Sequence, residues 1–166
     1  MRLFIVITKH LSMKILNSAT LTLIVFAVLS LSSSSTYAAT NLKLNPNLNY
    51  SSDSNDGPLI TGDNMHNGVI RDGKSTYIIF YHRECYNSKR QARRTVELYD
   101  KYMGRVDFIV VDLDSPRSAE QNDLVKKHYR NYIPHVTIVD KTGGVVYDRS
   151  GEVGNGSTSD ILDKLL

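Results

Sequence analysis

Short apolar segments recur along the second half of the chain and predict buried β-strands. They are Thr76–Tyr81 (TYIIFY), Val106–Leu113 (VDFIVVDL) and His135–Asp140 (HVTIVD), each rich in β-branched or aromatic residues. Continuous apolar runs of about four to eight residues are typical of strands covered on both faces. The turn sequence KTGG follows the third run, so Val145–Asp148 is expected to return as the second strand of a hairpin.

A different spacing between these runs predicts helices. One helix is expected over 88–103, followed by the stop signal Gly104, because apolar residues recur there at steps of three and four. Those apolar residues are Ala92, Val96, Tyr99 and Met103. A second helix is expected to begin after Ser115 or Ser118, either of which is a suitable cap, and to end near Arg130.

The chain is predicted to end in a short helix capped by Ser157 or Thr158. Its apolar residues are Ile161, Leu162, Leu165 and Leu166. The predicted order is strand, helix, strand, helix, strand, strand, helix. Strands joined through helices favour parallel pairing by right-handed crossovers, whereas the closing hairpin is antiparallel. The pattern therefore predicts an α/β fold with a mixed sheet and helices on both faces.

The N-terminal segment has the pattern of a secretory signal. Basic residues, an apolar run from Leu21 to Leu31 and small residues ending at Ala38-Ala39 follow one another there. The apolar run is about half the roughly 20 residues that cross a bilayer, so cleavage near Ala39 is expected, with an uncleaved membrane anchor as the alternative. A start at Met13 would give a more compact signal. The sequence thus predicts export, to a periplasm or the external medium.

Three regions are expected along the chain: a signal peptide at 1–39, a flexible linker at 40–60 and one domain at 61–166. Thr40–Gly57 is rich in Asn and Ser and has few residues to bury, which is typical of a flexible lead-in. The length that remains after cleavage fits one domain with one core.

The net charge of +3 belongs to the predicted signal. The chain has 20 Lys and Arg against 17 Asp and Glu, and three of the basic residues but no acidic one precede Ala39. The mature chain is then formally neutral, which removes the support for general nucleic-acid binding. No membrane contact is expected after cleavage. The basic run Lys89–Arg94 is interpreted as a solvated helix face, with an acidic partner or the carboxylates of glutathione as the alternative.

Cys85 is the only cysteine of the chain and stands in YHRECYNSKR, where a strand is predicted to end and a helix to begin. A helix N-terminus and the nearby cations Arg83, Lys89 and Arg90 favour the thiolate form of a cysteine. The alternative is that Cys85 is a small buried apolar residue. A single cysteine in an exported chain points to a thiol partner in another molecule, and a disulfide-linked homodimer is one such arrangement.

Two segments together resemble the thioredoxin family. FYHRECYNSK, with Cys85 at the strand-to-helix junction, resembles the active-site segment of that family. YIPHVTIVDKTGGVV resembles its second signature, an Ile-Pro followed by a strand, a Gly-containing turn and another strand. The resemblance covers roughly Gly68–Leu166 and implies a thioredoxin-like three-layer α/β/α fold. It also implies a cis peptide bond between Ile133 and Pro134, with Pro134 beside Cys85 and the Ile133 backbone offered to a client peptide.

The chain departs from the thioredoxin pattern around the cysteine. Ser88 stands in place of the second cysteine of Cys-x-x-Cys, Ile79 in place of a buried acid, and Glu84 in place of a tryptophan. Without a second thiol no internal disulfide can form, although Ser88 is expected to be able to donate a hydrogen bond to the Cys85 thiolate. Glu84 is the one local feature that opposes ionisation of the thiol.

The leading hypothesis is an exported monothiol oxidoreductase that exchanges with, or captures, disulfides of client proteins or glutathione. A binding module without redox turnover, using the groove beside Pro134, is the alternative. A metal held by Cys85, His82 and His135 is a third, less favoured interpretation, because both histidines are readily explained as strand-end residues. No metal or cofactor is therefore predicted. The predicted catalytic residues are Cys85, Ser88 and Pro134, and the predicted client-binding residues are Tyr86, Asn87, Ile133 and His135.

Overall fold

A four-stranded sheet forms the centre of the part of the chain that the computed structural model describes, residues 38–54 and 57–166. Its strands are β3 (Thr76–Tyr81), β4 (Asp107–Asp112), β5 (His135–Val139) and β6 (Val145–Ser150), in the order β4-β3-β5-β6. The helices are α2 (Tyr86–Tyr102), α3 (Ala119–His128) and α4 (Asn155–Leu165), and a separate ladder pairs β1 (Thr40–Leu44) with β2 (Ile60–Asp63). Residues 1–37 of the predicted signal peptide (1–39) lie outside the described residues. Ala39, the last residue of that prediction, is buried in the core, and its N–H donates to the Phe108 carbonyl at 3.0 Å.

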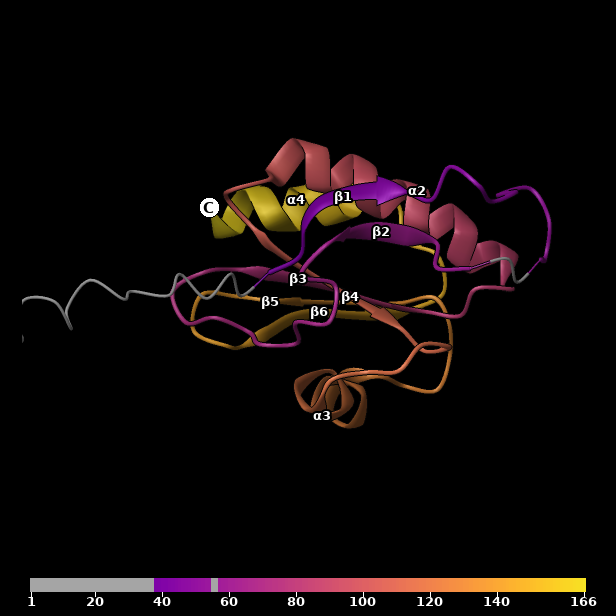
Figure 1. Cartoon of the computed structure of the whole chain (residues 1–166). Helices are drawn as coiled ribbons and strands as arrows, with labels where there is room; N and C mark the ends of the chain where they lie inside the picture. Colours follow the sequence, from indigo (N-terminus) through magenta and orange to yellow (C-terminus); the bar gives the residue numbers. More distant parts are fainter. Residues whose placement is uncertain (1–37, 55–56) are drawn as a thin grey trace, which may run out of the picture. The chain divides into compact units, whose positions relative to one another are not determined.

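The central sheet buries one apolar cluster on each face. Along β3, Tyr77, Ile79 and Tyr81 belong to one cluster and Ile78 and Phe80 to the other, as the two-residue period of a strand requires. Figure 1 shows α2, α4 and the β1–β2 ladder on one side of the sheet and α3 on the other. The predicted α/β class with a mixed sheet between two helical layers is therefore confirmed.

The direction of β5 differs from the sequence expectation. β3 and β4 are parallel, as predicted, but β5 runs antiparallel to β3, with His135 opposite Phe80. A parallel strand would need a helix that returns the chain to the opposite edge of the sheet. In Figure 1, α3 is seen nearly along its axis, so it runs across the strands rather than alongside them. The helix therefore does not carry the chain back to the other end of the strands, and β5 starts at the end of the sheet where β4 stops.

The helix boundaries lie within a few residues of those predicted. Ser118 rather than Ser115 caps α3, and its hydroxyl accepts a hydrogen bond from the Gln121 N–H at 3.1 Å. α4 begins earlier than predicted, with Gly154 as its N-cap. Thr158 lies inside that helix, where its hydroxyl bonds to the Gly154 carbonyl at 3.2 Å.

The segment 40–60, expected to be a flexible linker, instead contains a strand and several core residues. Leu42, Tyr50 and Leu59 are buried in the same cluster as α2. The Tyr50 hydroxyl also donates to the Leu59 carbonyl at 2.5 Å, which closes the connection between β1 and β2. Sparse apolar residues are enough here because each one meets a surface that the rest of the domain supplies.

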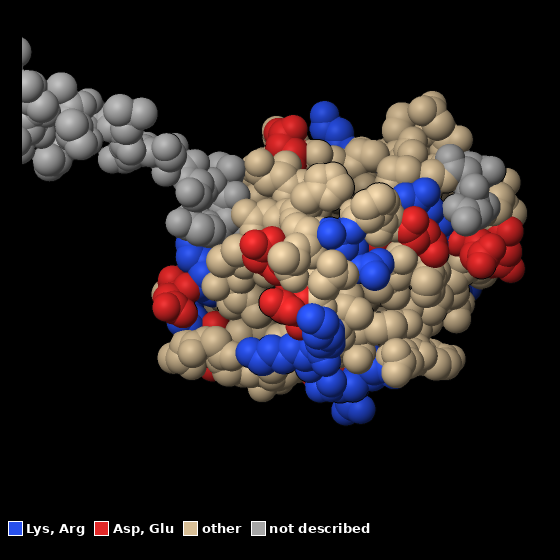
Figure 2. Space-filling model, turned by 60° about the horizontal axis from the view of Figure 1, so that its bottom comes forward, with Lys and Arg blue, Asp and Glu red and all other residues tan. Residues whose placement is uncertain are grey.

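Charged side chains of both signs share the surface of the domain. α3 carries Lys126 and Lys127 in its last turn, where cations interact favourably with the helix dipole. Figure 2 shows the face turned toward α3, on which Lys and Arg side chains gather next to Asp and Glu. None of the helices in the described ranges is both long and apolar enough to cross a membrane.

Candidate functional site

Cys85 lies at the junction of β3 and α2 and is neither buried nor fully exposed. It is the N-cap of α2, with extended backbone angles (φ −80°, ψ 118°), and its carbonyl accepts the first helical hydrogen bond from the Lys89 N–H at 3.0 Å. The side chain makes no capping hydrogen bond. Cys85 is therefore partly accessible as a residue at the helix N-terminus, which disagrees with the alternative of a fully buried apolar cysteine.

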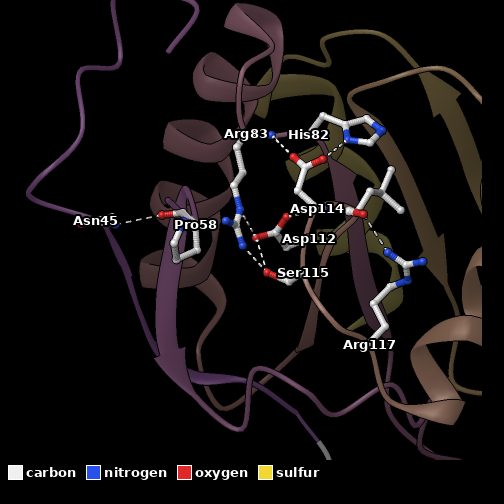
Figure 3. Close-up of polar contacts among 9 residues, drawn as sticks. Asn45, Pro58, His82, Arg83, Asp112, Asp114, Ser115 and Arg117 are labelled. Atoms are coloured by element: carbon white, nitrogen blue, oxygen red, sulfur yellow. Dashed lines mark hydrogen bonds and ion pairs between the residues drawn. The ribbon is translucent and has the colours of Figure 1, made fainter. Parts of the chain in front are cut away.

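The short segment between β3 and Cys85 is held against the end of β4. The Arg83 side chain donates to the Asp112 carboxylate at 2.8 Å and to Ser115, while its backbone N–H donates to Asp114 at 2.7 Å. The His82 ring bonds to the same Asp114 carboxylate at 2.7 Å (Figure 3). Burial alone would raise the pKa of Asp114, but the hydrogen bonds from Arg83 and His82 together lower it. The hydrogen bonds of His82 and Arg83 thus hold the backbone that leads to Cys85 against the residues that follow β4.

Pro134 lies at the same end of the sheet as Cys85. Phe80 on β3 is paired with His135 on β5, and the two strands are antiparallel. Tyr81, which follows Phe80, and Pro134, which precedes His135, therefore lie at the same end of the strands. The Ile133–Pro134 peptide bond is cis, as the resemblance implied, and the Pro134 carbonyl accepts from the Gly151 N–H at 2.8 Å.

These observations decide the fold: a strand that ends at a helix-capping cysteine, a parallel neighbour, and an antiparallel hairpin entered through a cis-proline. The fold is thioredoxin-like. No protein-family model matches the sequence, and no curated protein matches it. The fold is therefore assigned from the order and direction of the strands and from the positions of Cys85 and Pro134.

Several solved structures are similar to the chain at low sequence identity. Thioredoxin-2, described as a component of the malaria parasite protein secretion machinery, is 18% identical, with a TM-score of 0.49, 59% of this chain and 89% of that chain covered. A thioredoxin-like protein from Clostridium perfringens is 21% identical, with a TM-score of 0.48 and coverages of 57% and 73%. Fasciola hepatica thioredoxin is 17% identical, with a TM-score of 0.46 and coverages of 57% and 84%.

Around the thioredoxin-like cysteine, Ser88 does not lie as the sequence suggested. Its side chain is fully buried, and its hydroxyl has no hydrogen-bond partner among the described residues. The expected hydrogen bond from Ser88 to the Cys85 sulfur is therefore not formed. The side chain points into the domain one helical turn beyond the thiol.

The predicted client-binding residues separate into surface and interior positions. Tyr86 is exposed, with the Arg90 guanidinium 4.6 Å from the centre of its ring, and Asn87 and Ile133 are partly buried. His135 is fully buried, and its ring contacts Ser150 at 2.9 Å and Asp148 at 2.7 Å, both on β6. Its side chain offers no surface to a client, because its ring packs against Phe80 and Tyr129 in the interior.

The basic run after Cys85 is only partly the solvated face that was predicted, because Arg90 and Arg93 are exposed whereas Lys89 is not. Lys89 is fully buried, and its ammonium donates to the Asn49 carbonyl (2.9 Å), the Ser52 carbonyl (2.6 Å) and the Ser54 hydroxyl (3.0 Å). The interpretation of Lys89 as a solvated cation is therefore wrong, because backbone carbonyls of the 49–54 segment replace water around it.

Arg90 and Arg94 also form ion pairs with another segment of the domain. Both pair with Glu152, in the loop before α4, at 2.9 Å. The hydrogen bond from Arg90 is the main cause that lowers the pKa of Glu152. The two arginines therefore tie α2 to the segment that enters α4.

Asp53 is a site residue that the sequence reasoning missed. Its carboxylate accepts a hydrogen bond from the Tyr86 N–H at 2.7 Å, at the first residue of α2 and next to Cys85. An acidic residue in a polar loop 33 positions away gives no local signal for this contact.

Among the described residues, no group of three or more His, Cys, Asp or Glu is arranged to hold a metal ion.

Proposed function

We propose that this chain is a thioredoxin-like protein that uses the single thiol of Cys85 for thiol-disulfide exchange or for mixed-disulfide capture. The observation that carries the proposal is the position of Cys85. It is a partly exposed N-cap of α2 at the end of the sheet where β3 stops, and the cis bond before Pro134 lies at the same end. A thiol at a helix N-terminus meets unpaired N–H groups and the positive end of the helix dipole, which stabilise a thiolate.

The proposed reaction has one chemical step on this chain. The Cys85 thiolate attacks one sulfur of a client disulfide, a new sulfur–sulfur bond forms between Cys85 and that sulfur, and the client's own disulfide bond breaks. The released sulfur leaves as a thiolate and takes a proton from solvent. A glutathione disulfide would react in the same way and leave Cys85 joined to glutathione.

Release of the captured partner then requires a thiol from outside the chain. Ser88 occupies the sequence position from which a second cysteine would attack the mixed disulfide. A serine hydroxyl is too weak a nucleophile near neutral pH to displace a sulfur from a disulfide. An external thiol, such as a low-molecular-weight thiol or a protein thiol, attacks the mixed disulfide and restores Cys85. The proposal therefore includes long-lived mixed disulfides, or a disulfide-linked homodimer where the partner is a second copy.

A second candidate function is a binding module without redox turnover. Asp53 favours it, because a carboxylate at the first N–H of α2 places negative charge where a thiolate would be stabilised. In that case the surface near Tyr86, Asn87 and Ile133 would bind a partner without covalent chemistry. Export to a periplasm or the external medium is part of both proposals and depends on the N-terminal sequence pattern.

The decisive experiment compares wild type with Cys85→Ser in cells of the source, or of a host that exports the chain. Cells are quenched with acid, free thiols are blocked, and the protein is captured and analysed on non-reducing gels. Bands of higher mass that disappear on reduction and are absent from Cys85→Ser support capture through the thiol. The same bands in both proteins would contradict it.

The rate of alkylation of Cys85 against pH separates the two candidates. A redox thiol reacts fast at neutral pH, since the thiolate is already present there. A rate that rises only above about pH 8.5, as for a free cysteine, favours the binding module.

A further inference from the structure

A serine, a histidine and an aspartate lie together between β5 and β6. His135, the first residue of β5, is paired with Ser150, the last residue of β6, and Thr137 is paired with Asp148. Residues two apart on a strand point to the same face, so the Asp148 and Ser150 side chains both lie on the face of the His135 ring. The hairpin therefore brings a hydroxyl, an imidazole and a carboxylate within contact of one another.

Both ring nitrogens of His135 have a polar neighbour. Nδ1 lies 2.9 Å from the Ser150 hydroxyl oxygen, and Nε2 lies 2.7 Å from Asp148 Oδ1. Thr137 Oγ1 lies 3.3 Å from the same Nε2. A carboxylate can only accept, so Nε2 carries the ring proton and Nδ1 keeps a lone pair. That lone pair accepts the hydrogen of the Ser150 hydroxyl.

The surroundings of His135 suit a group that takes up a proton. The ring is fully buried, and burial, helped by the charge of Arg130, lowers its pKa, so the ring is neutral at pH 7. The Asp148 carboxylate and the His128 carbonyl raise the pKa, which means that they stabilise the ring once it is protonated. Arg130 also donates to Asp148 Oδ2 at 2.9 Å and holds the carboxylate in place. His135 is thus a neutral base with an oriented counter-charge.

Ser150 is the exposed member of this group. Among the described strands β6 is paired only with β5, so Ser150 lies on the outer strand of the sheet, and the residue is exposed. Gly151 follows with a φ of 87°, and its N–H donates to the Pro134 carbonyl at 2.8 Å, which fixes the backbone next to Ser150. A reagent can therefore approach Ser150 from solvent, while the base behind it stays out of water.

We propose that Ser150 is a nucleophile, with His135 as its general base, that accepts an acyl group from an activated acyl donor such as a thioester or an aryl ester. A hydroxyl bonded to a base that a third group orients is the arrangement that activates serine nucleophiles in unrelated folds. The Ser150 oxygen bonds to the acyl carbon while its proton passes to His135 Nδ1. The bond from the acyl carbon to the leaving group breaks, and the leaving group takes that proton.

The products of this step are an ester on Ser150 and a free thiol or phenol. No oxidant or reductant is needed, because the acyl carbon keeps its oxidation state. The activity goes beyond the proposed function, since the Cys85 sulfur takes no part in it.

The test uses the full chain with Cys85→Ser, so that no thiol competes for the acyl group. The protein is incubated with p-nitrophenyl acetate, and acetylated peptides are quantified by mass spectrometry. Ser157, in the exposed first turn of α4, is the control within the same molecule. We expect Ser150 to be acetylated at least about ten-fold faster than Ser157, since a positioned general base contributes about 10²–10⁴-fold in enzymes. In urea that unfolds the chain, the two rates should become equal.

Variants of the same chain separate activation by the base from simple exposure. His135→Gln cannot take up the proton, so the acetylation of Ser150 should fall about ten-fold or more while that of Ser157 is unchanged. Asp148→Asn should lower the rate several-fold, because an amide no longer stabilises the protonated ring. Asp123→Asn, on the exposed surface of α3, is the matched control and should change neither rate.

The melting temperature of each variant is measured first, because the His135 ring is buried. The comparison of Ser150 with Ser157 in folded and unfolded chain needs no change at His135 and decides the matter where His135→Gln does not fold. The inference fails if the two serines react equally fast in the folded chain. It also fails if a folded His135→Gln variant acetylates Ser150 at the parent rate.

Discussion

At the scale of single residues, the surroundings of the Cys85 sulfur combine features that favour and oppose ionisation. The helix N-terminus favours the thiolate, whereas Asp53 brings a carboxylate to the first N–H of that helix. Arg90, which the sequence placed beside the thiol, is engaged with Glu152. Under the proposed function, the reactivity of Cys85 would therefore depend on the residues around the start of α2 more than on the number of nearby cations.

Replacing Ser88 by Cys should give the chain an internal disulfide. Residues three apart at the start of a helix have Cα atoms about 5 Å apart, within the roughly 4.4–6.8 Å that a disulfide spans. The new thiol would have to turn from the buried Ser88 position toward Cys85. We expect Ser88→Cys to lose two hydrogens on mild oxidation, measured by mass spectrometry, and to retain several-fold fewer partners on non-reducing gels. Ser157→Cys, on the exposed first turn of α4, is the control and should show neither change.

Removing the charge of Asp53 should speed the reaction of Cys85. An exposed carboxylate acts on a neighbouring charge with about 0.2–1 kcal/mol, so Asp53→Asn should raise the alkylation rate at neutral pH roughly 1.4- to 5-fold. Asp123→Asn, on the exposed surface of α3, should leave the rate unchanged. A slower Asp53→Asn variant would mean that the Asp53 side chain positions the loop rather than opposing the thiolate.

At the scale of elements, α2 is the structural centre of the site. It presents Cys85 at its first turn, buries Lys89 against the carbonyls of the 49–54 segment, and pairs Arg90 and Arg94 with the loop before α4. A buried ammonium is tolerated only where acceptors replace its water, and here three do. The connection between β1 and β2 is consequently part of the site and not a linker.

Lys89→Met should release that connection. Hydrogen bonds from a charged group contribute about 1.5–3 kcal/mol each, but the methionine keeps the apolar contacts, so we expect a net loss of about 1–3 kcal/mol in the free energy of unfolding. Urea denaturation measures this loss, and limited proteolysis should show new cleavage within 49–54. Lys127→Met, at an exposed position of α3, is the control. Equal stabilities of the two variants would show that the buried ammonium holds nothing in place.

At the scale of the whole molecule, the interior contains two histidines beside the hairpin of β5 and β6. Burial is the main cause that lowers the pKa of both His128 and His135, and the Asp148 carboxylate only partly opposes it. Lys127 and Arg130 act in the same direction as burial on His128. The folded domain therefore holds both rings neutral at a pH where an unfolded chain would protonate them.

The stability of the domain should fall as the pH drops below the ordinary histidine value of about 6.5. The unfolded state binds more protons there, so the free energy of unfolding decreases with decreasing pH until the folded-state pKa values are passed. Urea midpoints at about pH 7.5 and 5.5 test this above the range in which carboxylates titrate. His128→Gln should reduce the difference between the two midpoints, and His66→Gln, at an exposed position, should not. A midpoint that is independent of pH would contradict the prediction.

The sequence by itself determined the strands of the central sheet, the helices α2, α3 and α4 and the place of the thiol, but not β1 and β2. The apolar runs of β3, β4 and β5 and the three-and-four spacing of α2 report contacts within a few residues, which local pattern records well. The class of the fold and the position of Cys85 follow from them. Ser118 as the cap of α3 was one of two candidates, and only the backbone geometry chose between them.

Only the tertiary structure decided the direction of β5, the burial of Lys89 and the approach of Asp53 to α2. In each case the partners are distant in sequence: the carbonyl of Asn49 that receives Lys89 lies 40 positions away, and Asp53 lies 33 from Tyr86. A charged or polar residue carries the same local pattern whether its partner is water or another segment. Its role is therefore fixed only when the fold brings that segment to it.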